Sequence, residues 1–175
     1  KQAYLEMENL ATTDELTQIS NRRFIMEFAE QEFRRNKRYG CECAIIILDI
    51  DHFKKINDQH GHDIGDEVLI KVSQTLKEAI RSVDRIGRFG GEEFLIVLPK
   101  ISLKDALFVA ERLRQIVEEL PFTIADATFK VTVSLGVDCC QTEDKTLGQV
   151  IKRADQALFC AKDNGRNQVY TLKEI

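Results

Sequence analysis

The spacing of apolar side chains predicts a chain in which helices and strands alternate. Apolar residues recur at helical intervals in five segments, at residues 1–14, 21–38, 66–80, 103–120 and 147–163. Gly40 and Pro121 are placed to end the second and fourth of these helices. Residues 44–50 are instead continuously apolar apart from Asp49, which is typical of a strand buried on both faces.

Three further stretches carry the pattern of strands. Residues 85–89 and 93–98 flank Gly90-Gly91 and are predicted to form an antiparallel hairpin, with the glycines supplying the positive φ angles of a tight turn. Residues 129–137 alternate apolar with polar or small side chains, which predicts a strand with one strongly buried face. Residues 167–171 fit a short edge strand.

The order of these elements predicts the fold class. The polar residues 52–65, interrupted by glycines, are interpreted as a connection between the buried strand and the helix after it. The resulting order is helix, strand, helix, hairpin, helix, strand, helix. It predicts one α/β domain, an α+β sandwich whose central mixed, mainly antiparallel sheet is flanked by helices.

Composition excludes several classes of protein. The chain has 175 residues, of which 43% are hydrophobic and 31% charged, so we expect a compact domain rather than a disordered one. A net charge of -4 argues against nucleic acid or an anionic membrane surface as a partner. No apolar run approaches the roughly 20 residues of a membrane span, and we expect a cytoplasmic location. The spacing of the five cysteines favours reduced thiols over a disulfide framework or a zinc site.

Three carboxylates are predicted to meet at one edge of the sheet. Asp49 ends the buried strand, and Glu92 and Glu93 directly follow the hairpin glycines. Carboxylates suit Mg²⁺, which keeps its other positions for water or phosphate, so this edge fits a nucleoside triphosphate. The backbone at Gly90 and Gly91 can approach a ligand that any side chain would exclude. The alternative is a plain glycine hairpin followed by surface glutamates.

Six motifs in order resemble the GGDEF family of diguanylate cyclases. Gly90–Phe94 resembles the family's signature in its GGEEF form. The other five are Asp14–Arg23, Asp49–Asp58, Gly61–Asp66, Ser134–Val137 and Ala154–Asn167. The resemblance covers about residues 14–170. Gln18 stands where the family usually has glycine, so we expect an altered turn there but no loss of activity.

The resemblance implies a fold like that of nucleotidyl cyclases and polymerase palms, and an enzyme that joins two GTP into cyclic di-GMP with release of two pyrophosphates. Residues 14–175 would form this domain, and residues 1–13 a linker or signalling helix. Asp49, the carbonyl of Ile50 and Glu92 would hold Mg²⁺, for which Mn²⁺ could substitute. Glu93 would assist the metal or the attacking 3′-hydroxyl.

The resemblance also places residues at the nucleotide. Asn57 and Asp66 would read the guanine edge, although a turn asparagine and a helix N-cap aspartate are ordinary alternatives. Lys162 and Arg166 would hold the β- and γ-phosphates with Lys54 nearby, although basic residues are common at helix ends. The resemblance also places Phe53 and His62 in the GTP site. Phe53 is expected to pack rather than stack, and no catalytic role for His62 follows from its chemistry.

Arg81 and Asp84 stand where the family carries its RxxD product-inhibition site, and Arg112 on the following helix could assist them. An arginine plane can stack on guanine or contact phosphate with two N–H groups, while aspartate accepts from the guanine N1 and N2 groups. Most such pairs are surface charges of little energetic weight.

Two copies of the chain are predicted to be needed for catalysis. The sequence supplies one carboxylate set and one set of nucleotide-binding groups, whereas a cyclic dinucleotide needs two GTP. We therefore expect a homodimer, with an upstream sensor or regulatory domain controlling the encounter. The alternative is a catalytically inactive domain that binds GTP or cyclic di-GMP and regulates a partner.

Overall fold

A computed structural model describes residues 12–124 and 127–173. Its helices are α2 (Arg22–Tyr39), α3 (Phe53–His60), α4 (His62–Ala79), α5 (Leu103–Glu118) and α6 (Leu147–Asp163). Its strands are β1 (Cys43–Ile50), β2 (Arg85–Arg88), β3 (Glu93–Pro99), β4 (Phe122–Ile124), β5 (Ala127–Phe129), β6 (Val133–Cys139) and β7 (Val169–Tyr170). Of the helix predicted at residues 1–14, residues 1–11 lie outside the described residues. Thr13 forms a β-bridge with Ser20 instead of continuing a helix.

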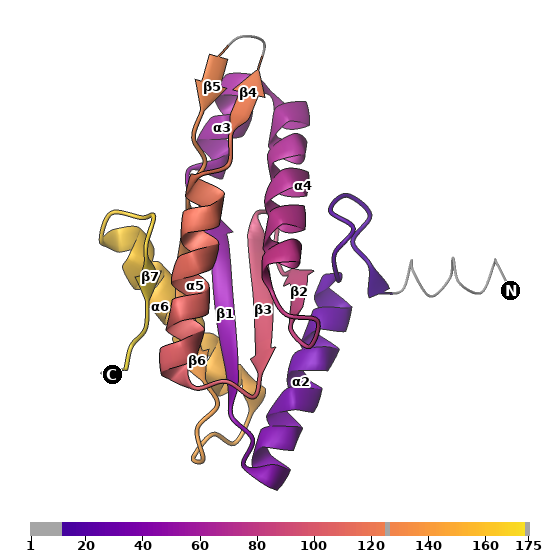
Figure 1. Ribbon diagram of the computed structural model, residues 1–175, viewed down its shortest axis with the longest axis vertical. Coiled ribbons are helices and arrows are strands. Elements are labelled where there is room, and N and C mark those ends of the chain that lie inside the picture. The colour runs from indigo at the N-terminus through magenta and orange to yellow at the C-terminus, as the bar shows by residue number, and fades with distance from the viewer. Residues whose placement is uncertain (1–11, 125–126, 174–175) are drawn as a thin grey trace, which may run out of the picture.

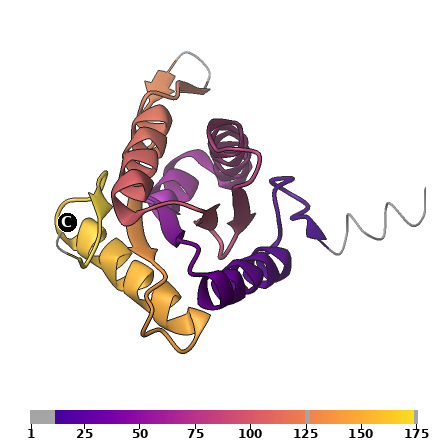
Figure 2. The ribbon, with the colours of Figure 1, turned by 60° about the horizontal axis from the view of Figure 1, so that its bottom comes forward.

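A five-stranded sheet in the order β2-β3-β1-β6-β7 forms the centre of the molecule (Figure 1). All its pairings are antiparallel except that of β6 with β7. Helices α4 and α5 cover one face, and α2 and α6 cover the other (Figure 2). This arrangement confirms the predicted α+β sandwich with a mixed, mainly antiparallel sheet.

The long helices follow the sequence prediction because their ends carry strong signals. Asn21 caps α2 by accepting a hydrogen bond from the Phe24 N–H, and Gly40 ends the helix with a left-handed φ of 66°. Ser102 caps α5 in the same way through the Asp105 N–H. Helix α6 covers residues 147–163 as predicted.

The connection predicted at residues 52–65 is wrong, because most of it is helical. Phe53 and Ile56 of α3 are buried in the core, so this short polar helix is held by two apolar anchors. Gly61 separates α3 from α4 with a φ of 89°, a conformation that L side chains rarely adopt. Helix α4 therefore begins four residues before the predicted start.

The single strand predicted at residues 129–137 is also wrong in two respects. Lys130, Val131 and Thr132 interrupt it, and Phe129 belongs instead to the small hairpin of β4 and β5. Strand β6 is buried on both faces rather than one, because α6 packs against the face that carries the small and polar residues.

Gly136 in β6 allows the close approach of α6. A Cβ atom there would lie 2.0 Å from the Ala154 carbonyl oxygen and 2.3 Å from the Leu158 nitrogen, both of them backbone atoms that cannot rotate away. Gly148, near the start of α6, has only the Thr146 hydroxyl within 4 Å, at 3.7 Å.

Replacing Gly136 by alanine should lower the free energy of unfolding by about 1–3 kcal/mol or more, because helix and strand must separate. Gly148→Ala is the matched control and should leave stability unchanged or slightly higher. Urea denaturation of both variants measures the difference. Equal stability of the two variants would show that α6 can shift without cost.

Candidate functional site

The pairing of β1 with β3 brings the predicted carboxylates to one edge of the sheet. Asp49 lies directly opposite Glu93 in the antiparallel register. One residue further, the Ile50 N–H donates to the carbonyl oxygen of Glu92 at 3.2 Å. Asp49, Ile50, Glu92 and Glu93 therefore come together as the sequence predicted.

Asp49 is nearly buried, with 6% of its surface exposed. The pKa of this carboxyl is raised to about 6: burial raises it most, the facing Lys162 lowers it, and the neighbouring charges of Glu92 and Glu93 raise it. The Lys162 Nζ lies 3.0 Å from an Asp49 carboxylate oxygen, which joins the last turn of α6 to this edge. Lys162 thus pairs with a buried carboxylate rather than serving only as a helix-end charge.

The donor set at this edge fits a hard divalent cation. Carboxylate and carbonyl oxygens are the ligands that Mg²⁺ takes, and it needs only one or two carboxylates when substrate phosphates complete its shell. Between residues 12 and 173, leaving out 125 and 126, no three acidic, histidine or cysteine side chains stand in a ready-made metal cluster. Asp49 faces Lys162 instead.

The two signature glycines do not have the positive φ angles predicted for them. The loop closes instead through Glu93, whose carbonyl oxygen accepts hydrogen bonds from the Phe89 and Gly90 N–H groups at 2.8 and 3.2 Å. A Cβ on Gly90 would lie 2.5 Å from a carboxylate oxygen of Glu93, whereas Gly91 has nothing within 4 Å. Gly90 thus leaves room for the Glu93 carboxylate, although this flexible side-chain end can move away from a Cβ atom.

Arg88 braces this loop, a role that the sequence analysis missed. Its guanidinium donates to the Gly91 carbonyl oxygen at 2.9 and 3.1 Å and contacts the Asp14 carboxylate at 3.3 Å. Thr17 also donates to Asp14. Gln18, at the position where glycine was expected, adopts a left-handed φ of 57°, so the turn keeps a conformation that glycine favours.

Asn57 and Asp66 lie on neighbouring helices, and neither matches its ordinary alternative. Asn57 lies within α3 rather than in a turn, and Asp66 lies inside α4, whose N-cap is Gly61. The Asn57 side-chain oxygen is buried and has no hydrogen-bond partner among the described residues. A Cβ on Gly65 would come within 1.8 Å of that oxygen, so glycine there makes room for the amide.

The other residues predicted to surround the nucleotide divide by burial. Phe53 is 9% exposed and packs in the core, as expected. Exposed side chains predicted to contact the nucleotide are Lys54, His62 and Arg166.

Arg81 and Asp84 form a fixed ion pair at the end of α4. Two guanidinium nitrogens of Arg81 contact the carboxylate of Asp84 at 2.8–3.2 Å, and one also donates to the Pro99 carbonyl oxygen at 3.0 Å. Arg112 from α5 reaches the same helix end and donates to the Ala79 carbonyl oxygen at 2.8 Å. The three predicted residues therefore lie around one end of α4.

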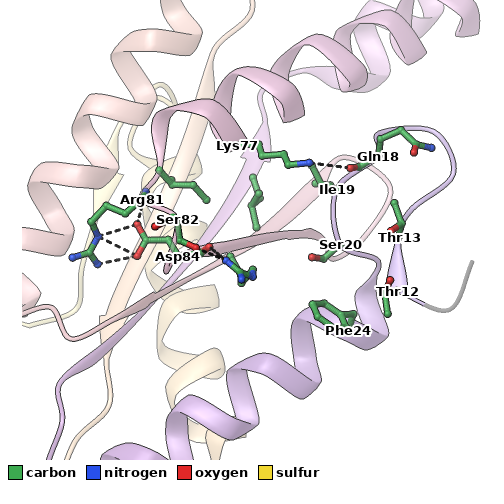
Figure 3. A pocket seen from close by; sticks show the side chains of 13 residues that line it. Thr12, Thr13, Gln18, Ile19, Ser20, Phe24, Lys77, Arg81, Ser82 and Asp84 are labelled. Atoms are coloured by element: carbon green, nitrogen blue, oxygen red, sulfur yellow. Dashed lines mark hydrogen bonds and ion pairs between the residues drawn. The ribbon is translucent and has the colours of Figure 1, made fainter. Parts of the chain in front are cut away.

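A cavity of about 440 Å³ adjoins this ion pair (Figure 3). It lies between the end of α4, the start of α2 and the segment before α2. Its lining includes Ser20, Phe24, Lys77, Arg81 and Asp84. Lys77 points toward the carbonyl oxygen of Gln18 across it, at 3.4 Å.

No helix of the described segments is both long and apolar enough to cross a bilayer.

The chain matches known proteins over nearly its whole length. Residues 11–168 match the family model described as diguanylate cyclase, GGDEF domain. The response regulator PleD of Caulobacter vibrioides is 43% identical over 162 residues, which are 91% of this chain and 36% of PleD. Diguanylate cyclase DgcP of Pseudomonas aeruginosa is 42% identical over 91% of this chain and 24% of its own length. The chain thus spans only a part of these curated relatives.

Solved structures show the same fold. The active GGEEF domain of a Vibrio cholerae diguanylate cyclase superposes with a TM-score of 0.84 at 37% identity, covering 90% of this chain and 100% of that one. SiaD of Pseudomonas aeruginosa, solved with its activator SiaC, gives 0.88 at 38% identity, covering 96% and 64%. DgcB of Caulobacter crescentus, solved with cyclic di-GMP, gives 0.91 at 27% identity, covering 97% and 90%.

The family model covers most of the chain, and relatives above 40% identity extend over nine tenths of it. The chain therefore belongs to the GGDEF domain family of diguanylate cyclases.

Proposed function

We propose that this domain joins two GTP molecules into cyclic di-GMP and releases two pyrophosphates. The observation that carries the proposal is the carboxylate edge, where Asp49 opposes Glu93 and faces Lys162 from α6. All the carboxylates and glycines of the family signature are present in this chain. A catalytically inactive module that only binds the nucleotide is the alternative that the first experiment below tests.

Asp49, the Ile50 carbonyl and Glu92 would hold the divalent cation, with Glu93 beside them. Mg²⁺, or Mn²⁺ in its place, would supply positive charge at the α-phosphate and the leaving pyrophosphate. Glu93 lies opposite Asp49, where its carboxylate can contact the metal or orient the attacking 3′-hydroxyl. The space in front of Gly91 admits the substrate close to the backbone.

Asn57 and Asp66 give a chemical reason for GTP over ATP. The Asn57 side-chain oxygen is buried and unpaired in the described residues, and an unpaired buried acceptor costs free energy. If the amide rotated toward the ligand, a guanine N–H donor would satisfy it. The exposed carboxylate of Asp66 can accept from the N1 and N2 groups, which adenine does not present.

Lys162, Arg166 and Lys54 would neutralise the β- and γ-phosphates. Lys162 already lies at Asp49, so a triphosphate held at the carboxylate edge comes within its reach. Exposed Arg166 follows three residues after α6 ends, and Lys54 projects from the first turn of α3.

Glu92→Ala should reduce cyclic di-GMP formation from GTP and Mg²⁺ by more than about a hundredfold, because a metal ligand is lost while the fold remains. Glu143→Ala, an exposed glutamate in the loop before α6, is the matched control and should keep full activity. Chromatography of the nucleotides measures both. No product from the parent chain would favour the inactive module, and activity within a few-fold of the parent in Glu92→Ala would remove the metal assignment.

Catalysis would require two copies of the chain, since the described residues supply one carboxylate set and one guanine-binding pair. In a two-fold arrangement each 3′-hydroxyl can face the α-phosphate of the other nucleotide. Upstream segments would control this encounter, as the names of relatives suggest: PleD is a response regulator, and DgcB was solved with a coiled coil.

Specific activity should therefore rise with chain concentration in the dilute range, where most molecules are monomers, and a strong dimerising helix fused before Lys1 should raise it further. Activity is measured per chain over a dilution series, alongside sedimentation of the same samples. Constant specific activity well below the measured dimer dissociation constant would contradict the two-copy model.

Arg81, Asp84 and Arg112 would form a separate site for the product. Arg81 holds its charge beside a buried carboxylate, so guanidinium and carboxylate are presented together, as recognition of a guanine base and a phosphate requires. The site lies just after α4, outside the signature turn although only a few residues before it in the sequence.

Arg81→Ala should weaken cyclic di-GMP binding by about tenfold or more and relieve product inhibition, because two charge-assisted contacts are lost. Arg23→Ala, which removes an exposed ion pair on α2, should change neither. Calorimetry with cyclic di-GMP compares the two variants, and unchanged affinity in Arg81→Ala would remove this site.

A further inference from the structure

Asp51 follows the carboxylate edge in the sequence but has a different set of partners. Its side chain accepts hydrogen bonds from the Thr132 and Ser134 hydroxyls, both at 2.7 Å, and from the Asn167 N–H at 3.0 Å. Only 4% of its surface is exposed. These three donors engage both carboxylate oxygens, so Asp51 joins the end of β1 to the start of β6 and to the turn after α6.

That turn has an unusual backbone. Gly165, Arg166 and Asn167 have φ angles of 109°, 64° and 47°, so three consecutive residues lie in the left-handed region. Only glycine adopts this region without cost, and strained residues persist where surrounding contacts over-determine them. The contacts of Arg166 and Asn167 with the rest of the domain therefore decide whether the turn keeps this shape.

Asn167 is clamped from a second direction by α5. Arg114 donates to the side-chain oxygen of Asn167 at 2.7 Å, and the side-chain nitrogen of Asn167 donates to Glu118 at 2.9 Å. Arg114 itself is fixed by ion pairs to Glu111 at 2.8 Å and Glu118 at 2.6 Å, and is 13% exposed. The backbone N–H and both amide atoms of the Asn167 side chain are thus hydrogen-bonded to residues far away in the sequence.

We propose that Asp51 and Arg114 are positioning residues that hold the turn at residues 164–167, so that Arg166 and Lys162 meet the triphosphate at the carboxylate edge. The inference rests on the proposed function, in which Arg166 and Lys162 hold the phosphates. Asp51 acts through Asn167, as an acceptor of hydrogen bonds, and it does not bind the metal.

The Asp51→Asn variant distinguishes a hydrogen-bonding role of Asp51 from a metal-binding one. Its side-chain oxygen can accept from the Thr132 hydroxyl and the Asn167 N–H, while its NH₂ group donates to the Ser134 hydroxyl, which can also accept. Asp51→Asn therefore preserves the anchor of the turn, whereas Asp51→Ala removes it. A metal ligand would respond differently, because asparagine lacks the carboxylate charge.

The experiment compares the affinities of 3′-deoxy-GTP, which cannot cyclise, and GMP, which lacks the β- and γ-phosphates, both in the presence of Mg²⁺. In Asp51→Ala the ratio of the two affinities should fall about tenfold, because the phosphate contacts are displaced while guanine recognition remains. Asp51→Asn should keep most of the parent ratio. Arg114→Met should lower the ratio in the same direction and leaves Asp51 in place.

Asp144→Ala is the matched control for loss of a buried aspartate. Asp144 accepts from the Gln141 N–H at 2.8 Å and pairs with Arg153 at 2.7 Å, in the loop before α6. It should lower thermal stability but leave the affinity ratio at the parent value.

Each outcome decides the inference. A parent ratio kept by both Asp51→Ala and Arg114→Met would overturn it without touching the proposed function. Asp51→Asn as impaired as Asp51→Ala would assign a charge role to Asp51 and overturn positioning by hydrogen bonds. A parent chain with equal affinity for 3′-deoxy-GTP and GMP would overturn both the inference and the proposed phosphate site. If Asp51→Ala does not fold, Arg114→Met and Asp51→Asn still decide whether the turn is positioned by hydrogen bonds, because the inference requires a lowered ratio in the first variant and the parent ratio in the second.

Discussion

The antiparallel register of β1 between β3 and β6 is the constraint on which the rest of the site depends. It sets Asp49 opposite Glu93 on one side and opposite Ser134 on the other. A shift of one residue would turn every side chain of β1 to the other face of the sheet. Because all eight residues of β1 are buried, that register is held by packing on both faces. The packing of the core therefore determines which acidic side chains meet at this edge of the sheet.

Burial explains the electrostatics at this edge. Asp49 emerges from an apolar strand into a position where water is largely excluded, and its pKa rises to about 6 for that reason first. Lys162 provides the compensating charge from α6. The close contact of α6 with β6 at Gly136 sets how near that helix lies to the sheet. Because Lys162 belongs to α6, this contact also affects how near Lys162 lies to Asp49.

Much of the fold could be predicted from the sequence because its signals were strong. The helices at 21–38 and 147–163 have long apolar stripes and clear ends, and 44–50 has no polar alternation. Helix α3 was missed because it is short and polar, and its two buried residues, three positions apart, are too few to establish a helical period. The second buried face of β6 depends on where α6 packs, which is a tertiary contact that local alternation does not contain.

The sequence motifs named candidate residues for the site, but the geometry of these residues could not be predicted from the sequence. The carboxylates, the glycines and the pair proposed to bind guanine were named from motifs, whereas the contact between Gly90 and the Glu93 carboxylate appears only in the folded loop. The role of Asp51 also depends on partners 81–116 residues away in the sequence. Residues that position other residues are hard to recognise in a sequence, because their hydrogen bonds go to backbone and hydroxyl groups that are distant along the chain.

The most direct measurement is a crystal structure of the chain with 3′-deoxy-GTP and Mg²⁺. The account predicts the cation between Asp49 and Glu92, the β- and γ-phosphates at Lys162 and Arg166, and the guanine edge at Asn57 and Asp66. A triphosphate bound elsewhere, or a cation that contacts Asp51 instead of Asp49, would contradict it.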